Sequence, residues 1–175
     1  MTLTELVQDA RRATTAPDPI AALRRLQELV ADSAGDVLSW LPGGGSDEQV
    51  LYAEPAPTLL RVEIPPRTEY PPHDHLIPAC VAVLHGRETN TFYRAEGPAV
   101  IPVAEIETAA GGVLPMDEHV IHAVGNRTAG RSIALHLYLG DLFELSRKIW
   151  DLRTDTCAAY TDERYFALSH ITEPV

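Results

Sequence analysis

The sequence predicts a mainly β fold, a sandwich or barrel of short strands with helices packed against its outside. Apolar residues first recur at helix spacing, within residues 1–35. From about residue 49 the chain changes to short apolar segments separated by Pro, Gly and Asn. A length of 175 residues with 45% apolar residues suits one globular domain, so we expect residues 1–175 to form a single domain.

The first 35 residues are expected to form two helices. Apolar residues recur at helix spacing between Leu3 and Ala10, and Thr2 with Glu5 resembles a capping box. A second helix is expected to begin after Asp18, which is a suitable N-cap because a proline follows it. Its apolar stripe predicts packing against the rest of the fold.

The β-structure is expected to occupy about residues 49–142, followed by a C-terminal segment over residues 143–175. Strands are expected at residues 49–53, 58–64, 79–85, 89–94, 99–103, 119–124 and 132–139. Helical character is expected to return within residues 142–150, and the tail beyond it is expected to be irregular.

Composition argues against several classes of function. The formal net charge of -11 disfavours nucleic acid as a partner, because phosphate binding needs a basic surface. No stretch approaches the roughly 18 to 20 apolar residues of a membrane span, and the first residues do not resemble a signal peptide. Cys80 and Cys157 form no CxxC pair, so a cytoplasmic protein with reduced thiols is expected. The sequence does not specify an oligomeric state.

Two histidines one residue apart, His73 and His75, indicate a metal site. Residues i and i+2 of a strand point to one face, so a strand can direct both imidazoles at one point. A third imidazole, His119 or His122, would come from a neighbouring strand. These two are three residues apart and would face opposite sides of a strand, so one of them serves at most. Imidazole suits Fe, Zn, Cu and Ni alike, and the alternative is a solvated strand end with incidental histidines.

The histidine segments resemble the two cupin motifs. The segment containing His73 and His75, bounded by Gly86, resembles the first motif, and Gly112, Pro115, His122 and Asn126 follow the order of the second. The spacing from His122 to Asn126 matches the end of the second motif. This resemblance favours His122 as the third ligand and leaves His119 near the surface.

Three features depart from those motifs, one of which is a longer gap before His122. Asp117 stands where a glycine is usual, and the glutamate that usually follows HxH is absent, since Ala79 and Cys80 occupy that neighbourhood. A site of three neutral ligands would keep the metal's full charge. We expect such a site to favour an anionic ligand such as a thiolate and to leave positions open for O2.

Four segments in order resemble the cysteine dioxygenase family of the cupin superfamily, and the likeness covers roughly residues 50 to 142. The segments are residues 72–75, 83–86, 121–126 and 135–138. The resemblance implies a cupin double-stranded β-helix barrel in which His73, His75 and His122 hold one Fe(II). It also implies that a small thiol and O2 are the substrates and that a sulfinate is the product.

His136 and Tyr138 are the candidate catalytic residues. In residues 133–139 these two polar residues share one face and the leucines share the other, which is expected of a barrel strand with polar residues inside. The alternative places both in solvent. The resemblance implies that Tyr138 hydrogen-bonds oxygen or substrate and that His136 orients Tyr138. The family's serine in this segment is replaced by Ala134.

The family's substrate-binding arginine has no clear match in this sequence. The nearest local likeness, residues 52–54, places a carboxylate at the expected position. Arginines elsewhere are alternatives, because a guanidinium is the natural partner of a carboxylate, although each has a surface ion pair as its simpler interpretation. These arginines are Arg61, Arg67, Arg87 and Arg94.

Cys80 lies near the position of a cysteine that some members of the family link covalently to the active-site tyrosine. Counted from His75 it coincides with that position, whereas counted from Gly86 it misses by one, and a one-residue slip reverses the face of a strand. A link between Cys80 and Tyr138 and a buried thiol without that link both remain open.

Two other functions remain open on the same residues. One is a cupin oxygenase that uses the three-histidine iron site on a substrate without a thiol. The other is a cupin that binds a small ligand without catalysis. Residues 150–153 are expected either to cover the site and select substrate or to pack across the outside of the barrel.

Overall fold

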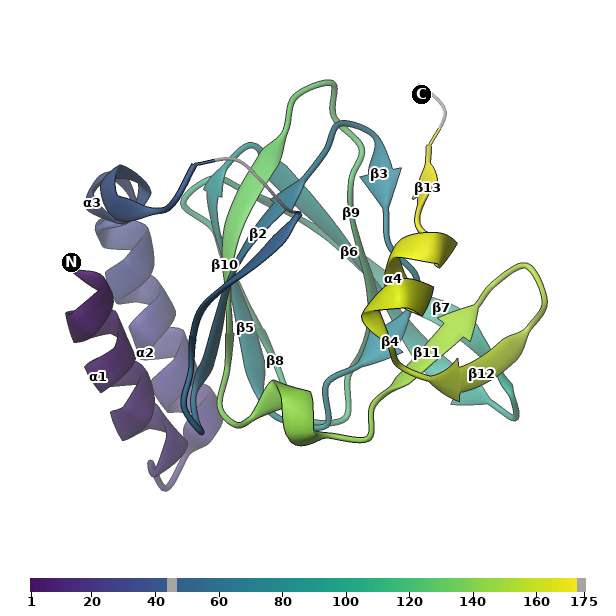
Figure 1. Ribbon diagram of the computed structural model, residues 1–175, viewed down its shortest axis with the longest axis horizontal. Coiled ribbons are helices and arrows are strands. Elements are labelled where there is room, and N and C mark those ends of the chain that lie inside the picture. Colours follow the sequence, from purple (N-terminus) through teal and green to yellow (C-terminus); the bar gives the residue numbers. More distant parts are fainter. Residues whose placement is uncertain (44–46, 173–175) are drawn as a thin grey trace.

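Two antiparallel β-sheets face each other in the computed structural model, which describes residues 1–43 and 47–172 (Figure 1). In this part of the chain the first sheet has five strands, in the spatial order β1 (Glu48–Ala53), β2 (Thr58–Ile64), β10 (Ser132–Tyr138), β5 (Ala79–His85) and β8 (Val113–Met116). The prediction of a mainly β fold is confirmed.

The second sheet has eight strands within the described ranges. Its main path is β12 (Thr156–Ala159), β11 (Lys148–Asp151), β4 (His73–Asp74), β9 (Ile121–Asn126), β3 (Thr68–Glu69) and β13 (His170–Ile171). The other side of β9 pairs with β6 (Arg87–Glu96), which in turn pairs with β7 (Ala99–Ala109). Strand β9 is therefore hydrogen-bonded along both edges.

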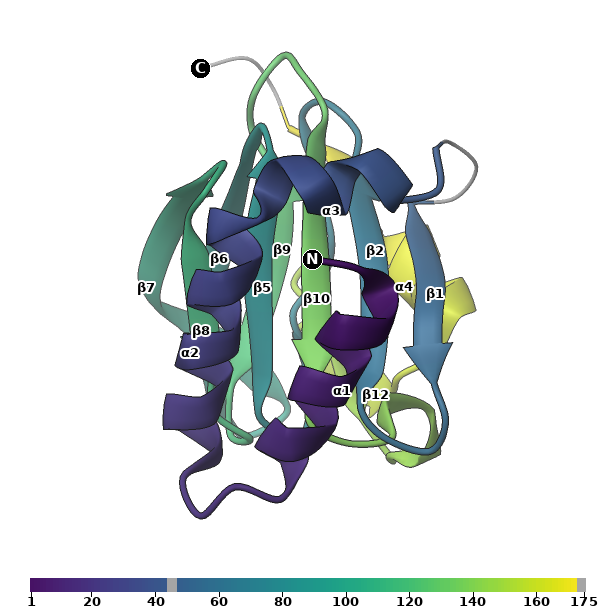
Figure 2. The same cartoon turned by 90° about the vertical axis from the view of Figure 1, so that its left-hand side faces the viewer.

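Three helices lie across the outer face of the first sheet (Figures 1 and 2). They are α1 (Leu3–Thr14), α2 (Pro19–Asp32) and α3 (Ala34–Trp40). The predicted caps are confirmed: Thr2 and Glu5 form a capping box, and the Asp18 side chain accepts the backbone N–H of Ala21. The helical region extends to Trp40, beyond the predicted end at residue 35.

The first sheet separates two apolar layers. Leu135 and Leu137 of β10 pack with Leu6 and Leu23 of the helices, while Leu60 of β2 packs with Tyr138 between the two sheets. Because successive side chains of a strand point to opposite faces, the leucines of β10 face the helices and its polar residues face the space between the sheets. This is the predicted orientation of β10.

The prediction that helical character returns within residues 142–150 is confirmed for a single turn only and is wrong for the rest of that segment. The structure has one turn of 3₁₀ helix, η1 (Leu142–Glu144), and then strand β11. Leu142, Leu145 and Ile149 have helix-like spacing, but Ile149 pairs with His73 of β4, about 75 residues earlier in the chain. Strand pairing at that separation overrides the local pattern.

The prediction of an irregular C-terminal tail is also wrong. Strand β12 forms a hairpin with β11, and helix α4 (Asp162–Leu168) follows, with the Thr161 side chain accepting the N–H of Arg164 as an N-cap. Strands β6 and β7 are longer than predicted, β9 begins two residues later than predicted, and β8 was not predicted. Among the described residues no helix is long and apolar enough to cross a membrane.

Replacing Leu23 by alanine is expected to lower the free energy of unfolding by about 2–5 kcal/mol, because the change leaves a cavity between α2 and the first sheet. The Leu23 side chain is fully buried. The matched control on the same helix is Leu29→Ala, whose side chain is 43% exposed. Urea unfolding followed by circular dichroism measures both, and equal losses would contradict the packing of α2 described above.

Candidate metal centre

Two neighbouring strands bring His73, His75 and His122 together between the sheets. The antiparallel pairing of β4 with β9 places His73 opposite His122, and His75 follows directly after the end of β4. The Nε2 atom of His75 lies 3.2 Å from Nε2 of His73 and 3.1 Å from Nε2 of His122. All three side chains are buried.

The spacing and hydrogen bonds of these imidazoles fit a metal ion. Two nitrogens at about 2.1 Å from a common ion, with an angle of about 90–110° between them, lie about 3.0–3.4 Å apart. His73 Nδ1 donates to the carbonyl oxygen of Pro71 (3.0 Å) and His122 Nδ1 donates to Asn90 Oδ1 (2.8 Å). Both Nε2 atoms therefore carry lone pairs directed at one point, where a cation removes their mutual repulsion. The cluster could hold a metal ion.

Burial keeps the three imidazoles neutral, which is the form that binds metals. It lowers the pKa of His73 to about 3 and the pKa values of His75 and His122 well below the ordinary value. The neighbouring histidines lower the values for His75 and His122 further. The centre therefore offers three neutral nitrogen ligands, a set that suits several transition metals.

The structure separates the two candidates for the third ligand. His122 is buried in β9, whereas His119 lies in the turn before that strand with 85% of its side chain exposed. Its Nε2 atom lies 3.7 Å from the Oε1 atom of Glu118. His119 is therefore a surface residue.

His136 and Tyr138 face the histidine cluster from the first sheet. The Tyr138 hydroxyl lies 3.4 Å from His136 Nδ1, and the Tyr138 ring meets the His75 ring at a centroid distance of 4.9 Å. Burial raises the pKa of Tyr138 well above its ordinary value. The hydroxyl is thus retained as a hydrogen-bond donor beside the centre.

Two residues of β6 that sequence reasoning missed complete the polar interior. Glu88 accepts a hydrogen bond from His136 Nε2 (3.2 Å) and another from Asn90 Nδ2 (3.1 Å), and both side chains are buried. The available signal was their alternation at the beginning of the strand predicted at residues 89–94, which contains Asn90 and follows Glu88. Polar residues at alternate positions usually indicate a solvated face, which is why the pattern did not reveal them.

A cavity of about 180 Å³ leads to His73 and Tyr138. Arg147 lines it and is 9% exposed, with its guanidinium 3.8 Å from the centroid of the Tyr160 ring. Two acidic residues, Glu48 and Asp162, line the same cavity, and its remaining lining side chains are largely apolar. Arg147 was not among the arginines considered from the sequence, because it lies in the segment predicted to be helical.

The structure does not bring Arg61 or Cys80 to the histidine cluster. Arg61 pairs with Leu135 in the sheet and forms an ion pair with Glu63, on the face that the helices cover. Cys80 pairs with Leu137 and packs into the same helix-covered layer. Because Tyr138 points to the opposite face of the sheet, a Cys80–Tyr138 link does not fit this arrangement.

The other sequence candidates also lie away from the centre. Glu54 is exposed, and Tyr52 packs against the helices, so the carboxylate of residues 52–54 does not face the histidines. Arg87 pairs with Glu107 at the surface, and Arg94 is exposed. Arg67 lies before β3 and is absent from the lining of the cavity among the described residues.

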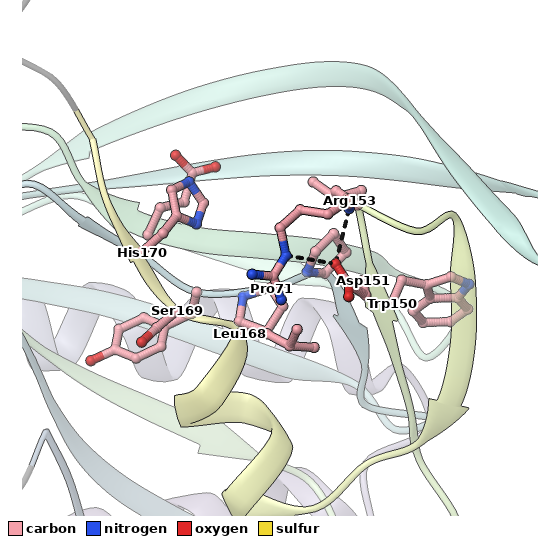
Figure 3. A pocket seen from close by; sticks show the side chains of 11 residues that line it. Pro71, Trp150, Asp151, Arg153, Leu168, Ser169 and His170 are labelled. Carbon is pink, nitrogen blue, oxygen red and sulfur yellow. Dashed lines mark hydrogen bonds and ion pairs between the residues drawn. The ribbon is translucent and has the colours of Figure 1, made fainter.

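Residues 150–153 line a different pocket, of about 360 Å³ (Figure 3). Pro71, Trp150, Arg153 and His170 are among its lining side chains. Trp150 points to the opposite face of β11 from Ile149, which is part of the core between the sheets. The segment that covers His73 is instead the one carrying Tyr160 and Tyr165, whose ring centroids lie 5.9 and 5.3 Å from that of His73.

No family model matches this chain. Solved structures similar to it include a cupin-2 domain containing protein from Shewanella frigidimarina, with 16% identity over 59% of this chain and 88% of that chain, at a TM-score of 0.42. A cupin superfamily protein from Desulfitobacterium hafniense has 18% identity over the same shares, at a TM-score of 0.47. A cupin family protein with a double-stranded β-helix fold from Methanocaldococcus jannaschii has 12% identity over the same shares, at a TM-score of 0.48.

His122→Ala is expected to abolish tight metal binding, because two imidazoles on one short segment cannot complete the site. His119→Ala is the matched control and is expected to bind metal like the unaltered protein. Metal content after loading with Fe(II) or Zn(II) and gel filtration, measured by elemental mass spectrometry, checks both. Equal metal content in the two variants would show that His122 is not a ligand.

The metal-free protein is expected to lose stability as the pH falls below about 6.5. The folded state keeps His73 neutral, with its pKa lowered to about 3, whereas the unfolded chain takes up a proton near the ordinary value. Each such histidine lowers the free energy of unfolding by about 1.4 kcal/mol per pH unit between its two pKa values. Urea unfolding at several pH values measures the slope. His122→Ala should reduce this slope by the contribution of one histidine, and an unchanged slope would contradict a buried neutral imidazole at His122.

Proposed function

We propose that this protein is an Fe(II)-dependent dioxygenase that oxidises a small thiol with O2 to the sulfinate. The observation that carries the proposal is a buried centre of three neutral imidazoles, one of which, His73, lines a small cavity together with Tyr138 and Arg147. Fe(II) in such a centre would supply the activation of O2 and of the thiolate. Both oxygen atoms end on sulfur, so thiol and O2 account for every atom of the sulfinic acid without another reductant.

The ligand set favours an anionic substrate group. Ala79, near the place of the usual cupin glutamate, packs beside Tyr138 and offers no ligand atom. Three neutral imidazoles leave the charge of a divalent ion uncompensated inside the barrel, where charge is poorly screened. A thiolate compensates that charge, and a thiol is acidified when it binds a metal.

Arg147 is the residue we propose as the anchor of a substrate carboxylate. Its guanidinium is held against the Tyr160 ring and is almost fully buried, which limits its conformations before a substrate binds. A guanidinium holds a carboxylate through two parallel hydrogen bonds. The acidic Glu48 and Asp162 on the same cavity would face an ammonium group, so a thiol with both groups, such as cysteine, finds partners for each.

Tyr138 and His136 act on the reacting atoms in this proposal. The phenol stays protonated because burial raises its pKa, so its one hydrogen can turn from His136 Nδ1 to an oxygen atom or to the substrate once either is bound in the cavity. His136 holds the Tyr138 hydroxyl from the other side. The size of the cavity, below the range of about 300–1,000 Å³ that is typical of drug-sized ligands, favours a substrate of a few heavy atoms.

The experiment that tests the proposal is oxygen uptake by anaerobically Fe(II)-loaded protein with cysteine, 3-mercaptopropionate and cysteamine, with products identified by mass. Uptake with a sulfinate product is expected, and thiols with a carboxylate should be preferred. No uptake with any thiol, despite bound iron, would reject the thiol reaction and favour an oxygenase acting on a small acid that Arg147 can hold. Metal binding with no oxygen use on either substrate class would favour a cupin that binds a ligand without catalysis.

Arg147→Gln is expected to raise KM for the carboxylate-bearing thiols by about 10- to 100-fold, since a charge-assisted hydrogen bond contributes about 1.5–3 kcal/mol. KM for cysteamine, which has no carboxylate, should change little. The control is Arg153→Gln, because Arg153 is an exposed arginine on the other pocket. Equal changes for all three thiols would show that Arg147 does not select the carboxylate.

A further inference from the structure

A buried carboxylate, Glu88, lies between the metal centre and the catalytic pair, and the proposed reaction assigns it no role. Glu88 is 1% exposed and lies in strand β6, between β7 and β9 of the second sheet. One of its oxygens accepts from His136 and the other accepts from Asn90. Burial of a carboxylate is costly, and here both oxygens have a partner.

The hydrogen bond to His136 determines where that ring carries its proton. A carboxylate has two acceptor oxygens and no donor, so the atom 3.2 Å from Glu88, His136 Nε2, has to carry a hydrogen. In the neutral ring, Nδ1 is then an acceptor. Nδ1 is the atom that lies 3.4 Å from the Tyr138 hydroxyl, so the phenol is the donor in that contact.

The hydrogen bond to Asn90 determines the direction of a second chain of contacts. The Asn90 amide nitrogen faces the carboxylate, so the amide oxygen is turned toward His122 Nδ1, at 2.8 Å. His122 Nδ1 has to donate to that oxygen. The lone pair of His122 is thereby placed on Nε2, the atom that faces the other two imidazoles.

We propose that Glu88 is a positioning residue that fixes the proton positions of His122 and His136 at the same time. Through Asn90 it directs the Nε2 lone pair of His122 to the metal, and through His136 it directs the hydrogen-bonding of Tyr138. Ala134, two residues before His136 on the same face of β10, has no polar atom that could take over this role. The effect on catalysis rests on the proposed function, whereas the two proton positions do not.

Glu88→Gln is the informative variant because glutamine has the shape of glutamate but offers one acceptor and one donor. The two hydrogen bonds cannot both keep their direction. If the amide nitrogen turns toward His136, the proton of that ring moves to Nδ1. If it turns toward Asn90, the Asn90 amide reverses and His122 loses its lone pair at Nε2.

The test uses ¹⁵N-histidine-labelled protein loaded with Zn(II), which is diamagnetic, and reads the protonated nitrogen of each ring by NMR. The resonances of His136 are assigned with His136→Gln. The unaltered protein should carry hydrogen on Nε2 of His136. Glu88→Gln should either move that hydrogen to Nδ1 or weaken Zn(II) binding by about 10- to 100-fold in competition with a chelator. Hydrogen on Nδ1 of His136 in the unaltered protein, or neither change in the variant, would overturn the proposal.

Two further variants separate positioning from a merely structural role. Asn90→Ala interrupts the contact to His122 alone, so Zn(II) affinity should fall while His136 keeps its hydrogen on Nε2. Glu107→Gln removes an exposed carboxylate on the neighbouring strand β7 and should change neither readout. If Glu88→Gln does not fold, the unaltered protein and Asn90→Ala decide the matter. Loss of the Nε2 hydrogen of His136 in Asn90→Ala would contradict the proposal that the contacts to His122 and to His136 are independent of each other. None of these readouts needs thiol oxidation, so failure of the proposed function is recognised separately.

Discussion

The register of β4 against β9 is the constraint on which the metal centre depends, because it sets His73 opposite His122. Strand β4 has two residues and is too short to hold that register alone. The C-terminal segment supports this register. The backbone N–H of Trp150 donates to the Pro72 carbonyl oxygen, and the Asp74 carboxylate accepts the backbone N–H of Lys148 at 2.7 Å. Strand β11 therefore contributes to the centre although it supplies no ligand.

Most polar side chains between the sheets satisfy one another's hydrogen bonds, whereas His75 Nδ1 is buried without a hydrogen-bond partner among the described residues. Buried polar groups without hydrogen bonds destabilise a fold, and Asn90, Glu88 and His136 form a continuous set of contacts that ends at Tyr138. The convergence of the His73 and His122 lone pairs on His75 Nε2 is the feature that these contacts do not relieve, since a hydrogen on that atom could satisfy one of them at most. A bound cation relieves it, so metal binding and folding stability are expected to be coupled.

Local patterns in the sequence predicted the helix caps, the inward face of β10 and the pairing of His73 with His75, and the resemblance to the second cupin motif selected His122 as the third histidine. Each depends on period, capping or order along the chain. The role of β11 and the place of Arg147 could not be predicted, because leucines at helix spacing concealed a strand whose partner is distant. Glu88 resembled a solvent-facing residue until the facing sheet was known. For Cys80 the sequence left both a link to Tyr138 and a buried thiol open, because a single residue of register decides which face of the strand it occupies, and sequence alone does not fix that register.

Different parts of the chain supply different properties of the site. The three neutral imidazoles of the candidate centre would leave the charge of a bound metal ion uncompensated beside His73 at the cavity wall, and the C-terminal segment adds the positive charge of Arg147 along that wall. In the same cavity of about 180 Å³, Glu48 and Asp162 would face an ammonium group, while a metal ion beside His73 and the Arg147 guanidinium would attract two anionic groups of a small molecule. On the proposed function these are the thiolate and the carboxylate, and their separation, rather than the metal ligands, would decide which thiol is oxidised.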